Sequence, residues 1–216
     1  MIEKFDIYDV MTSLLHGTLF LAATFVLFPQ VISVERPLEV SEILLSIIFI
    51  SIAYFLGQVI TSISGIIQPL LFWTWGGMPS SVLFSGHFPE KYLSSDFINR
   101  AKNTLQKTSA VKLSDAELFS NAMGIARKAE GSLSERHNQM YAYNRTALTN
   151  LILMFGLFVI SCSCGLCRNF SAGKIVAISA VLGLLLILHW YRAKQRAFYY
   201  VREVVVVAER ELSGGV

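Results

Sequence analysis

Charged residues are absent from one long stretch of this 216-residue sequence. Between Ile43 and Gly86 there is no Asp, Glu, Lys or Arg. A membrane-spanning helix needs only ~20 apolar residues, so this stretch is long enough for one span and more. Charged residues make up 15% of the whole chain, against ~25% in an average soluble domain. The shortage of charge excludes an ordinary soluble domain and predicts an integral membrane protein.

Cysteines are few and lie close together. The three of them, Cys162, Cys164 and Cys167, fall in one apolar segment, and no second Cys or His cluster completes a zinc site. We interpret them as small, polarizable residues that pack between helices. A disulfide is the alternative if this end of the protein faces an oxidising compartment.

Signatures of catalysis are also missing. The sequence contains no H-E-x-x-H, G-x-S-x-G or Walker motif. His87 and His137 have no carboxylate or histidine partner at the spacing of metal ligands, and His16 and His189 lie near the ends of apolar segments, within reach of interfacial water. We therefore expect no enzymatic activity, no cofactor and no metal.

Four apolar segments are present, each long enough to cross a bilayer. They cover residues 14–34, 43 to about 67, 146–167 and 174–191. The connections within the first pair and within the second pair are short, which forces antiparallel hairpins. The sequence predicts an all-α integral membrane protein with two transmembrane hairpins and with cytoplasmic helices between and after them. The predicted regions are a first hairpin at 1–72, an interfacial and helical region at 73–144, a second hairpin at 145–191 and a C-terminal helix at 192–216.

Lys and Arg are unevenly distributed between the segments that flank these spans. Residues 87–145 contain nine of them and the tail after residue 191 contains five, whereas the two short loops, counted with Lys174 at the start of the fourth segment, contain three in total. Cytoplasmic segments of membrane proteins are enriched in Lys and Arg. Both termini and the middle region are therefore expected in the cytoplasm.

The last part of the uncharged stretch, Gln68 to Gly86, contains helix breakers and aromatic residues. Pro69 and Gly76-Gly77 are expected to end the second span. Trp and Tyr favour the membrane interface, so the chain is expected to follow the membrane surface here. The predicted interfacial anchors of the whole chain are Trp73, Trp75, Trp190 and Tyr191. A re-entrant loop that lines a pore would use the same residue types.

Capping and periodic patterns predict helices in the cytoplasmic part. Ser95-Asp96 precedes an amphipathic pattern, and Ser114 with Glu117 forms a capping-box pattern. A third pattern after Gly131 is expected to continue directly into the third span. The tail is expected to continue the fourth span as a helix with an apolar seam suited to a bundle, with a strand at Val204–Val207 as the alternative.

The second span carries small and polar residues although it has no charge. They are Gln58, Thr61, Ser62 and Gly65. On a helix, Gln58, Ser62 and Gly65 share one face, which either lines an aqueous path or lets neighbouring helices pack closely. We favour packing, and in an oligomer one face can serve both purposes.

The second half of the chain resembles a known group of membrane proteins. ERHNQMYAYNRT precedes the third span and HWYRAKQRAFYYVRE ends and follows the fourth, and this arrangement looks like the two-span modules of SLATT-type conflict effectors. The layout of the full chain is similar to the KwaA family, the membrane subunits of the Kiwa anti-phage system. The resemblance implies an oligomer of the bacterial inner membrane that senses phage attack and works with a soluble, DNA-binding partner.

Three functions are consistent with these patterns. The first is an oligomeric sensor or scaffold subunit of an anti-phage complex that docks a soluble cytoplasmic protein. The others are a pore-forming effector opened by a defence signal and a transporter or membrane enzyme for a small substrate. Expected partners are the lipid bilayer, further copies of the chain, with four as a candidate number, and the soluble protein. A net charge of +3 is too small to predict direct nucleic-acid binding. The basic residues expected to dock the partner are Arg127, Lys128, Arg136 and Arg145.

Overall fold

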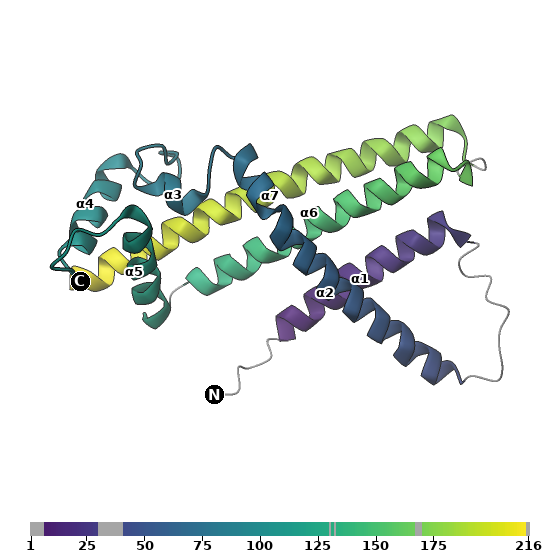
Figure 1. Cartoon of the computed structure of the whole chain (residues 1–216), viewed down its shortest axis with the longest axis horizontal. Helices are drawn as coiled ribbons and strands as arrows, with labels where there is room; N and C mark the ends of the chain where they lie inside the picture. The colour runs from purple at the N-terminus through teal and green to yellow at the C-terminus, as the bar shows by residue number, and fades with distance from the viewer. Residues whose placement is uncertain (1–6, 30–40, 130, 132, 167–169, 215–216) are drawn as a thin grey trace. The chain divides into compact units, whose positions relative to one another are not determined.

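The computed structural model describes residues 7–29, 41–129, 131, 133–166 and 170–214, and within these ranges it contains helices and no strands (Figure 1). Four of the helices are long and apolar enough to cross a membrane: α1, α2, α6 and α7. The predictions of an all-helical chain and of four apolar segments are confirmed. The helices are α1 (Ile7–Leu27), α2 (Glu42–Thr74), α3 (Pro79–Leu83), α4 (Ser95–Gln106), α5 (Asp115–Lys128), α6 (Ser134–Ser163) and α7 (Ala172–Leu212).

The chain forms two compact units. Unit 1 consists of the described part of Met1–Ile67 together with Tyr143–Trp190, and unit 2 consists of Gln68–Ala142 together with the described part of Tyr191–Val216. Helices α2, α6 and α7 each contribute residues to both units. The predicted continuation of the cytoplasmic pattern into the third span, and of the fourth span into the tail, is confirmed by the unbroken helices α6 and α7.

In unit 1, α1 and α2 cross at a point where neither helix has a side chain (Figure 1). A Cβ atom on Gly17 would lie 1.7 Å from the carbonyl oxygen of Ala53, and one on Gly57 would lie 1.8 Å from that of Ser13. The two backbones are therefore in contact, which only small residues permit.

Hydrogen bonds fix α6 against α1 in the same unit. Asn150 Nδ2 donates to the carbonyl oxygen of His16 at 3.1 Å, and Ser161 Oγ donates to that of Leu27 at 3.2 Å. The second bond lies further along both helices than the first, by the same number of residues in each. Helices α1 and α6 therefore run parallel.

Apolar side chains of unit 1 are largely exposed. Every residue from Glu42 to Ile52 in α2 is exposed, and the most apolar window of α7 contains no buried residue. Figure 1 shows the first half of α2 running away from α1 beyond their crossing. Large contiguous apolar surfaces are rare on soluble proteins, so these helices need lipid or other protein around them.

Helix α2 extends past its predicted end. The prediction that Pro69 breaks the helix was wrong, because Pro69 lies inside α2, which continues to Thr74. Prolines are tolerated inside membrane-spanning helices, where neighbouring groups and local adjustments satisfy the freed backbone carbonyl. The chain turns instead at Gly76 and Gly77, with φ angles of 86° and 126°, where the Gly77 N–H donates to the carbonyl oxygen of Phe72 at 2.9 Å.

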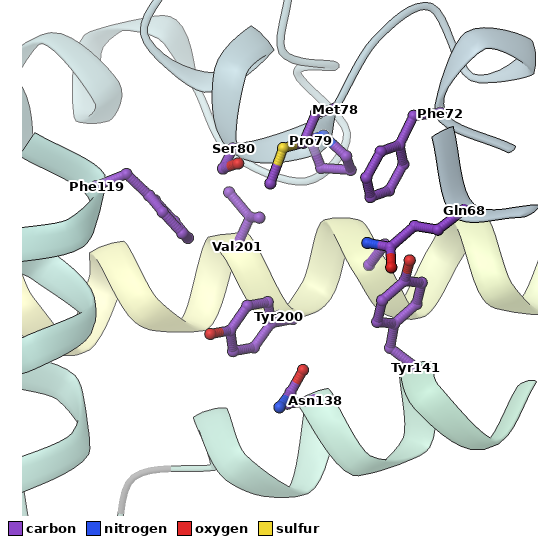
Figure 2. Close-up of a pocket in the computed structure, with 11 residues that line it drawn as sticks. Gln68, Phe72, Met78, Pro79, Ser80, Phe119, Asn138, Tyr141, Tyr200 and Val201 are labelled. Atoms are coloured by element: carbon purple, nitrogen blue, oxygen red, sulfur yellow. The ribbon is translucent and has the colours of Figure 1, made fainter. Parts of the chain in front are cut away.

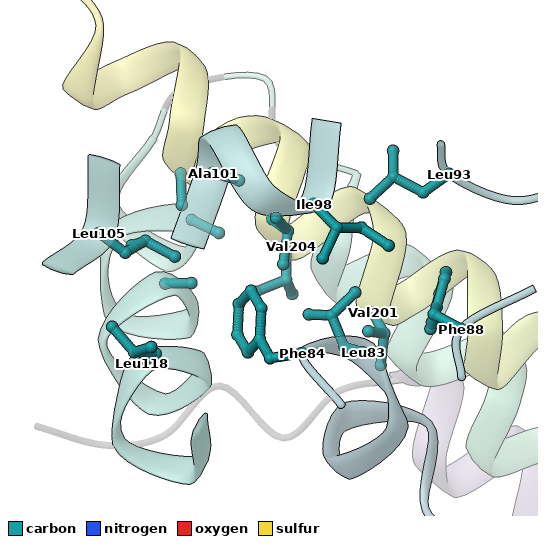
Figure 3. Packing of buried hydrophobic residues seen from close by; sticks show 14 of the residues in the cluster. Leu83, Phe84, Phe88, Leu93, Ile98, Ala101, Leu105, Leu118, Val201 and Val204 are labelled. Atoms are coloured by element: carbon teal, nitrogen blue, oxygen red, sulfur yellow. The ribbon is translucent and has the colours of Figure 1, made fainter. Parts of the chain in front are cut away.

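Unit 2 has its own hydrophobic core (Figure 3). The tail of α7 lies at its centre, where Val204 and Val205 are completely buried. The ring of Phe198 is 2% exposed and stacks on that of Tyr92, with 5.1 Å between ring centroids. The strand alternative for Val204–Val207 was wrong: these residues are helical, and their branched side chains fill the space between α7 and the shorter helices. Further core residues are Leu83, Phe84, Phe88, Ile98, Ala101, Leu105, Leu118, Ala122, Ala126, Val201 and Ala208.

Two ion pairs connect the helices of unit 2 at their surface. Arg100 Nε of α4 lies 3.2 Å from Glu209 Oε1 of α7, and Lys102 Nζ of α4 lies 2.6 Å from Asp115 Oδ1 of α5. Exposed pairs of this kind contribute ~0–1 kcal/mol. Burial of the core side chains, at ~1.5–3 kcal/mol for each large one, is therefore the main source of stability.

Serine side chains cap the starts of α4 and α5 in unit 2. Ser94 Oγ accepts the N–H of Phe97 at the start of α4, one residue before the predicted cap. The predicted capping box of α5 is confirmed: Ser114 Oγ accepts the N–H of Glu117, and Glu117 Oε2 accepts the N–H of Ser114 at 2.8 Å. These bonds satisfy donors that a helix start leaves unpaired.

Replacing Gly57 tests the contact between α1 and α2. A Cβ atom at this position meets the backbone of Ser13, so Gly57→Ala should cost at least ~1–3 kcal/mol and lower the thermal midpoint of the detergent-solubilised protein by several degrees. Gly65→Ala is the matched control, because a Cβ atom there has nothing within 4 Å. Equal midpoints for the two variants would contradict the close contact.

Replacing Ser114 tests the start of α5. The loss of an N-cap worth ~1 kcal/mol should accelerate amide hydrogen exchange in the first turns of α5 by about fivefold in Ser114→Ala, whereas Ser120→Ala in the same helix should leave the rate unchanged. Hydrogen bonds from the Ser114 hydroxyl and N–H lower the pKa of Glu117. A carboxylate with a lowered pKa stabilises the folded state above its unfolded pKa, so the protection of α5 should decline as the pH falls through the folded pKa of Glu117.

Candidate functional site

A line of buried polar side chains runs through unit 1. All of them are at most 4% exposed, and they come from α1, α2 and α6. Polar groups inside a membrane helix bundle are costly unless they are paired. The line consists of Ser13, His16, Ser64, Thr146, Thr149 and Asn150. None of these except His16 stands out in the sequence as a site candidate, because isolated Ser, Thr and Asn are common in apolar helices.

The predicted polar face of α2 is divided in the structure. Gln58 Nε2 donates to Ser13 Oγ at 2.9 Å and to Tyr54 OH at 3.2 Å, so Gln58 connects α2 to α1. The hydroxyls of Thr61 and Ser62 donate to carbonyl oxygens of their own helix, at 3.0 Å each. Ser62 and Gly65 are exposed. The buried face of α2 instead carries Ala53, Gly57, Ile60 and Ser64.

One end of the buried line holds a cationic side chain. Arg145 Nε donates to Ser64 Oγ at 3.2 Å, and Ser64 Oγ lies 3.4 Å from Thr146 Oγ1. Arg145 lies at the point where α6 becomes apolar, so its charge is placed at the edge of the candidate span. Charged groups at such positions are rare and usually functional. Arg145 was predicted as a docking residue, and the structure places it in unit 1, apart from Arg127, Lys128 and Arg136.

His16 lies next to Asn150 in this group, because the Nδ2 atom of Asn150 donates to its carbonyl oxygen. It is 2% exposed, its Nδ1 atom donates to the carbonyl oxygen of Thr12 at 2.6 Å, and its ring meets that of Tyr143 edge to face with 5.2 Å between centroids. The Oδ1 atom of Asn150 is buried and makes no hydrogen bond to any described residue. The arrangement holds helices together through directional bonds, which fixes their register more strictly than apolar packing alone.

The predicted interfacial anchors occupy different environments. Trp73 is 77% exposed and Tyr191 is 50% exposed, whereas Trp190 is half-buried. Trp75 is only 7% exposed. Its ring packs edge to face against Phe72 at 5.6 Å and Tyr141 at 6.3 Å, so Trp75 is part of the interior of unit 2.

The two ring neighbours of Trp75 also line a cavity in unit 2, with a volume of about 150 Å³ (Figure 2). Its wall is mostly apolar, with amide and hydroxyl groups at several points. In the view of Figure 2, the polar ends of Gln68 and Tyr141 point toward one another at one end of the cavity, and Phe119 lies at the other. The lining residues are Gln68, Phe72, Met78, Pro79, Ser80, Phe119, Asn138, Tyr141, Ala197, Tyr200 and Val201.

The other predicted docking residues are at the surface of unit 2. Arg127 and Lys128 are exposed in the last turn of α5, and Arg136 is exposed in the first turn of α6. Among the cysteines, Cys162 is half-buried and Cys164 is exposed, and the position of Cys167 lies outside the described residues.

Within the described ranges, no group of three or more His, Cys, Asp or Glu residues could hold a metal ion. No protein-family model, curated protein or solved structure matches the chain. The candidate site is therefore defined by its own residues: the buried polar line of unit 1, the cavity of unit 2 and the exposed basic residues of α5 and α6.

The side chain of Gln58 tests the polar contact between α1 and α2. Gln58→Leu removes the bonds to Ser13 and Tyr54, and hydrogen bonds between membrane helices contribute ~0.6 kcal/mol on average and up to ~1.7 kcal/mol. We expect a measurably lower thermal midpoint in detergent. Ser62→Ala should leave the midpoint unchanged, because its hydroxyl bonds only to its own helix. If Gln58→Leu and Ser62→Ala lower the thermal midpoint equally, the bonds of Gln58 to Ser13 and Tyr54 do not contribute to stability.

Proposed function

We propose that this chain is an oligomeric sensor or scaffold subunit of an anti-phage complex in the bacterial inner membrane. The observation that carries the proposal is the continuity of α2, α6 and α7, each of which contributes residues to an apolar unit and to a unit with a core of the soluble type. A protein that transmits a signal from a membrane to the cytoplasm needs such shared elements. The similarity to the Kiwa membrane subunits gives the biological setting.

The orientation in the membrane is part of this proposal. The parallel course of α1 and α6 supports the arrangement in two hairpins. Helices α1 and α6 point the same way. This is expected if the chain crosses the membrane an even number of times before α6 begins. Together with the excess of Lys and Arg in the middle region and the tail, these directions support two outward-facing short loops and cytoplasmic termini.

Self-association is proposed from the surfaces that the chain leaves uncovered. The first half of α2 and the apolar part of α7 are exposed, and Ser62 and Gly65 form a small-residue surface on α2. Small residues allow close approach of helices from neighbouring copies. Several copies, with four as a candidate number, would multiply the cytoplasmic docking surface and give avidity to a weak partner contact.

A soluble protein with an acidic face is the proposed cytoplasmic partner, and by the Kiwa resemblance it also binds DNA. Arg127 and Lys128 are exposed and adjacent at the C-terminal end of α5. Like Arg136 at the start of α6, they are free to meet carboxylates on another protein. Charge complementarity accelerates association and selects the correct partner.

A pore-forming effector is the second candidate function. It is favoured by the exposure of Ser62 beside Gln58 on α2, since a polar strip on an outer face can line a path between copies. In that case Gln58→Leu would alter the membrane depolarisation caused by infection, as read with a potential-sensitive dye. A scaffold would leave the membrane potential unaffected by the substitution.

Purification from native membranes tests the scaffold proposal. The tagged chain, expressed with its neighbouring genes, should copurify with a soluble protein as a complex of several copies. The double variant Arg127→Glu, Lys128→Glu should retain its oligomeric mass. The amount of copurifying soluble protein should fall at least tenfold, because like charges at an interface are strongly unfavourable.

Lys112→Glu provides the matched control, since Lys112 is an exposed cation of the same unit outside the proposed surface. It should retain the partner. A chain that is always recovered alone and monomeric would refute the proposal, and equal retention by both charge variants would refute this docking surface.

A further inference from the structure

We propose that the cavity of unit 2 binds the head group of a lipid-soluble quinone, an uncharged ring that carries carbonyl oxygens. The site is built by four segments: the end of α2, the start of α3, the first half of α6 and the tail of α7, with Phe119 of α5 closing one end (Figure 2). This inference depends on the membrane location of the chain but not on the docking of a soluble partner.

The volume of the cavity corresponds to one six-membered ring. It measures about 150 Å³, and an engineered apolar cavity of ~150 Å³ in another protein binds benzene. Four aromatic side chains line it: Phe72, Phe119, Tyr141 and Tyr200. Aromatic rings interact favourably with a planar ligand through offset stacking and edge-to-face contacts.

The lining carries no formal charge. Among the described residues that line the cavity there is no Asp, Glu, Lys, Arg or His. A phosphate or carboxylate ligand would lose its hydration there without gaining a counter-ion, which is strongly unfavourable. Nucleotides and the head groups of phospholipids are therefore poor ligands for this site.

The polar groups of the lining favour a ligand with hydrogen-bond acceptors. Asn138 carries an amide NH₂ donor, and Ser80 carries a hydroxyl donor. The hydroxyl of Tyr200 already donates to Met123 Sδ at 3.3 Å. A quinone ring presents two carbonyl acceptors and no donor, which matches this set. An acyl chain would leave the same groups facing methylene carbon and lose their hydrogen bonds.

The position of the site along the chain gives a membrane-soluble ligand access to it. Helix α2 has 33 residues, so it is about 50 Å long at 1.5 Å per residue, whereas the hydrocarbon core is only ~30 Å thick. Its last turns, which contain Gln68 and Phe72, therefore fall near a membrane surface. The adjacent Trp73 is exposed, as expected of a residue at the level of the lipid head groups.

A bound ring would contact the three helices that contribute to both units. Gln68 belongs to α2, Asn138 to α6 and Tyr200 to α7. Ligand occupancy would stabilise whichever arrangement of these helices completes the cavity. The site would thus make the subunit responsive to the quinone pool of the membrane.

Fluorescence quenching of Trp75 provides the test. Full-length protein with Trp73→Phe and Trp190→Phe, solubilised in detergent, retains only Trp75, which lies against the lining residues Phe72 and Tyr141. Decylubiquinone should quench it saturably. Decanol, which has the tail without the ring, should neither quench nor compete.

Two variants of this single-tryptophan protein distinguish binding of the quinone in the cavity from its partition into the detergent micelle. Asn138→Leu removes a donor at similar volume and should weaken the quenching midpoint about tenfold, as expected for a lost buried hydrogen bond. Ala197→Leu places extra atoms in the cavity and should abolish saturable quenching, with an unchanged thermal midpoint as evidence of folding. Asn103→Leu, an exposed position of α4 outside the cavity, should behave as the parent protein.

The proposal is overturned if Asn138→Leu and Ala197→Leu are quenched by decylubiquinone with the same quenching midpoint as the parent protein. It is also overturned if decanol displaces decylubiquinone and restores the fluorescence of Trp75, because the site would then accept alkyl chains without a ring.

Discussion

A polar group inside a bilayer has no water to bond, and unit 1 depends on meeting this constraint within the protein. The exposed hydroxyls of Ser46 and Ser51 donate to carbonyl oxygens of their own helix and so make no demand on neighbours. The described groups that bond across helices are spread along them, from Ser64 with Arg145 to Ser161 with Leu27, and Gln58 and Ser13 bond beside the backbone contact of Gly57. Apolar surface around this contact remains available for lipid or for other copies, so the helix arrangement is determined by a small number of directional bonds rather than by a large core.

Features encoded locally could be predicted from the sequence. Four apolar segments, the capping box of Ser114 and Glu117, and the continuity of α6 and α7 all depend on residues close together in the chain. The buried face of α2 could not be predicted in the same way. Hydropathy shows that a helix has several small polar residues, but only the neighbouring helix decides that Ser64 is buried while Ser62 is exposed. Pro69 illustrates a related point, because a proline does not by itself end an apolar helix of this kind.

The candidate cavity could not be predicted from the sequence for a different reason. Its lining comes from α2, α3, α5, α6 and α7, and no single segment shows more than ordinary aromatic and amide residues. The composition of the stretch from Gln68 to Gly86 did indicate an unusual junction, and both Gln68 and Phe72 belong to it. The residue type of Trp75 predicts an interfacial anchor, and its ring is buried against Phe72 and Tyr141 in unit 2. Aromatic residues at a junction are thus compatible with an interfacial anchor and with a cavity wall, and only tertiary contacts distinguish the two.

The central place of the α7 tail in unit 2 has a consequence for biosynthesis. Helices α3, α4 and α5 are translated well before residues 198–208, yet their apolar faces are buried largely against this tail. Until the last two spans have been inserted and the end of the chain has left the ribosome, those faces have no permanent cover. Nascent chains would therefore be candidates for chaperone binding during this interval, and a premature stop codon before residue 198 would leave these faces uncovered in a protein that cellular proteases can recognise as incomplete.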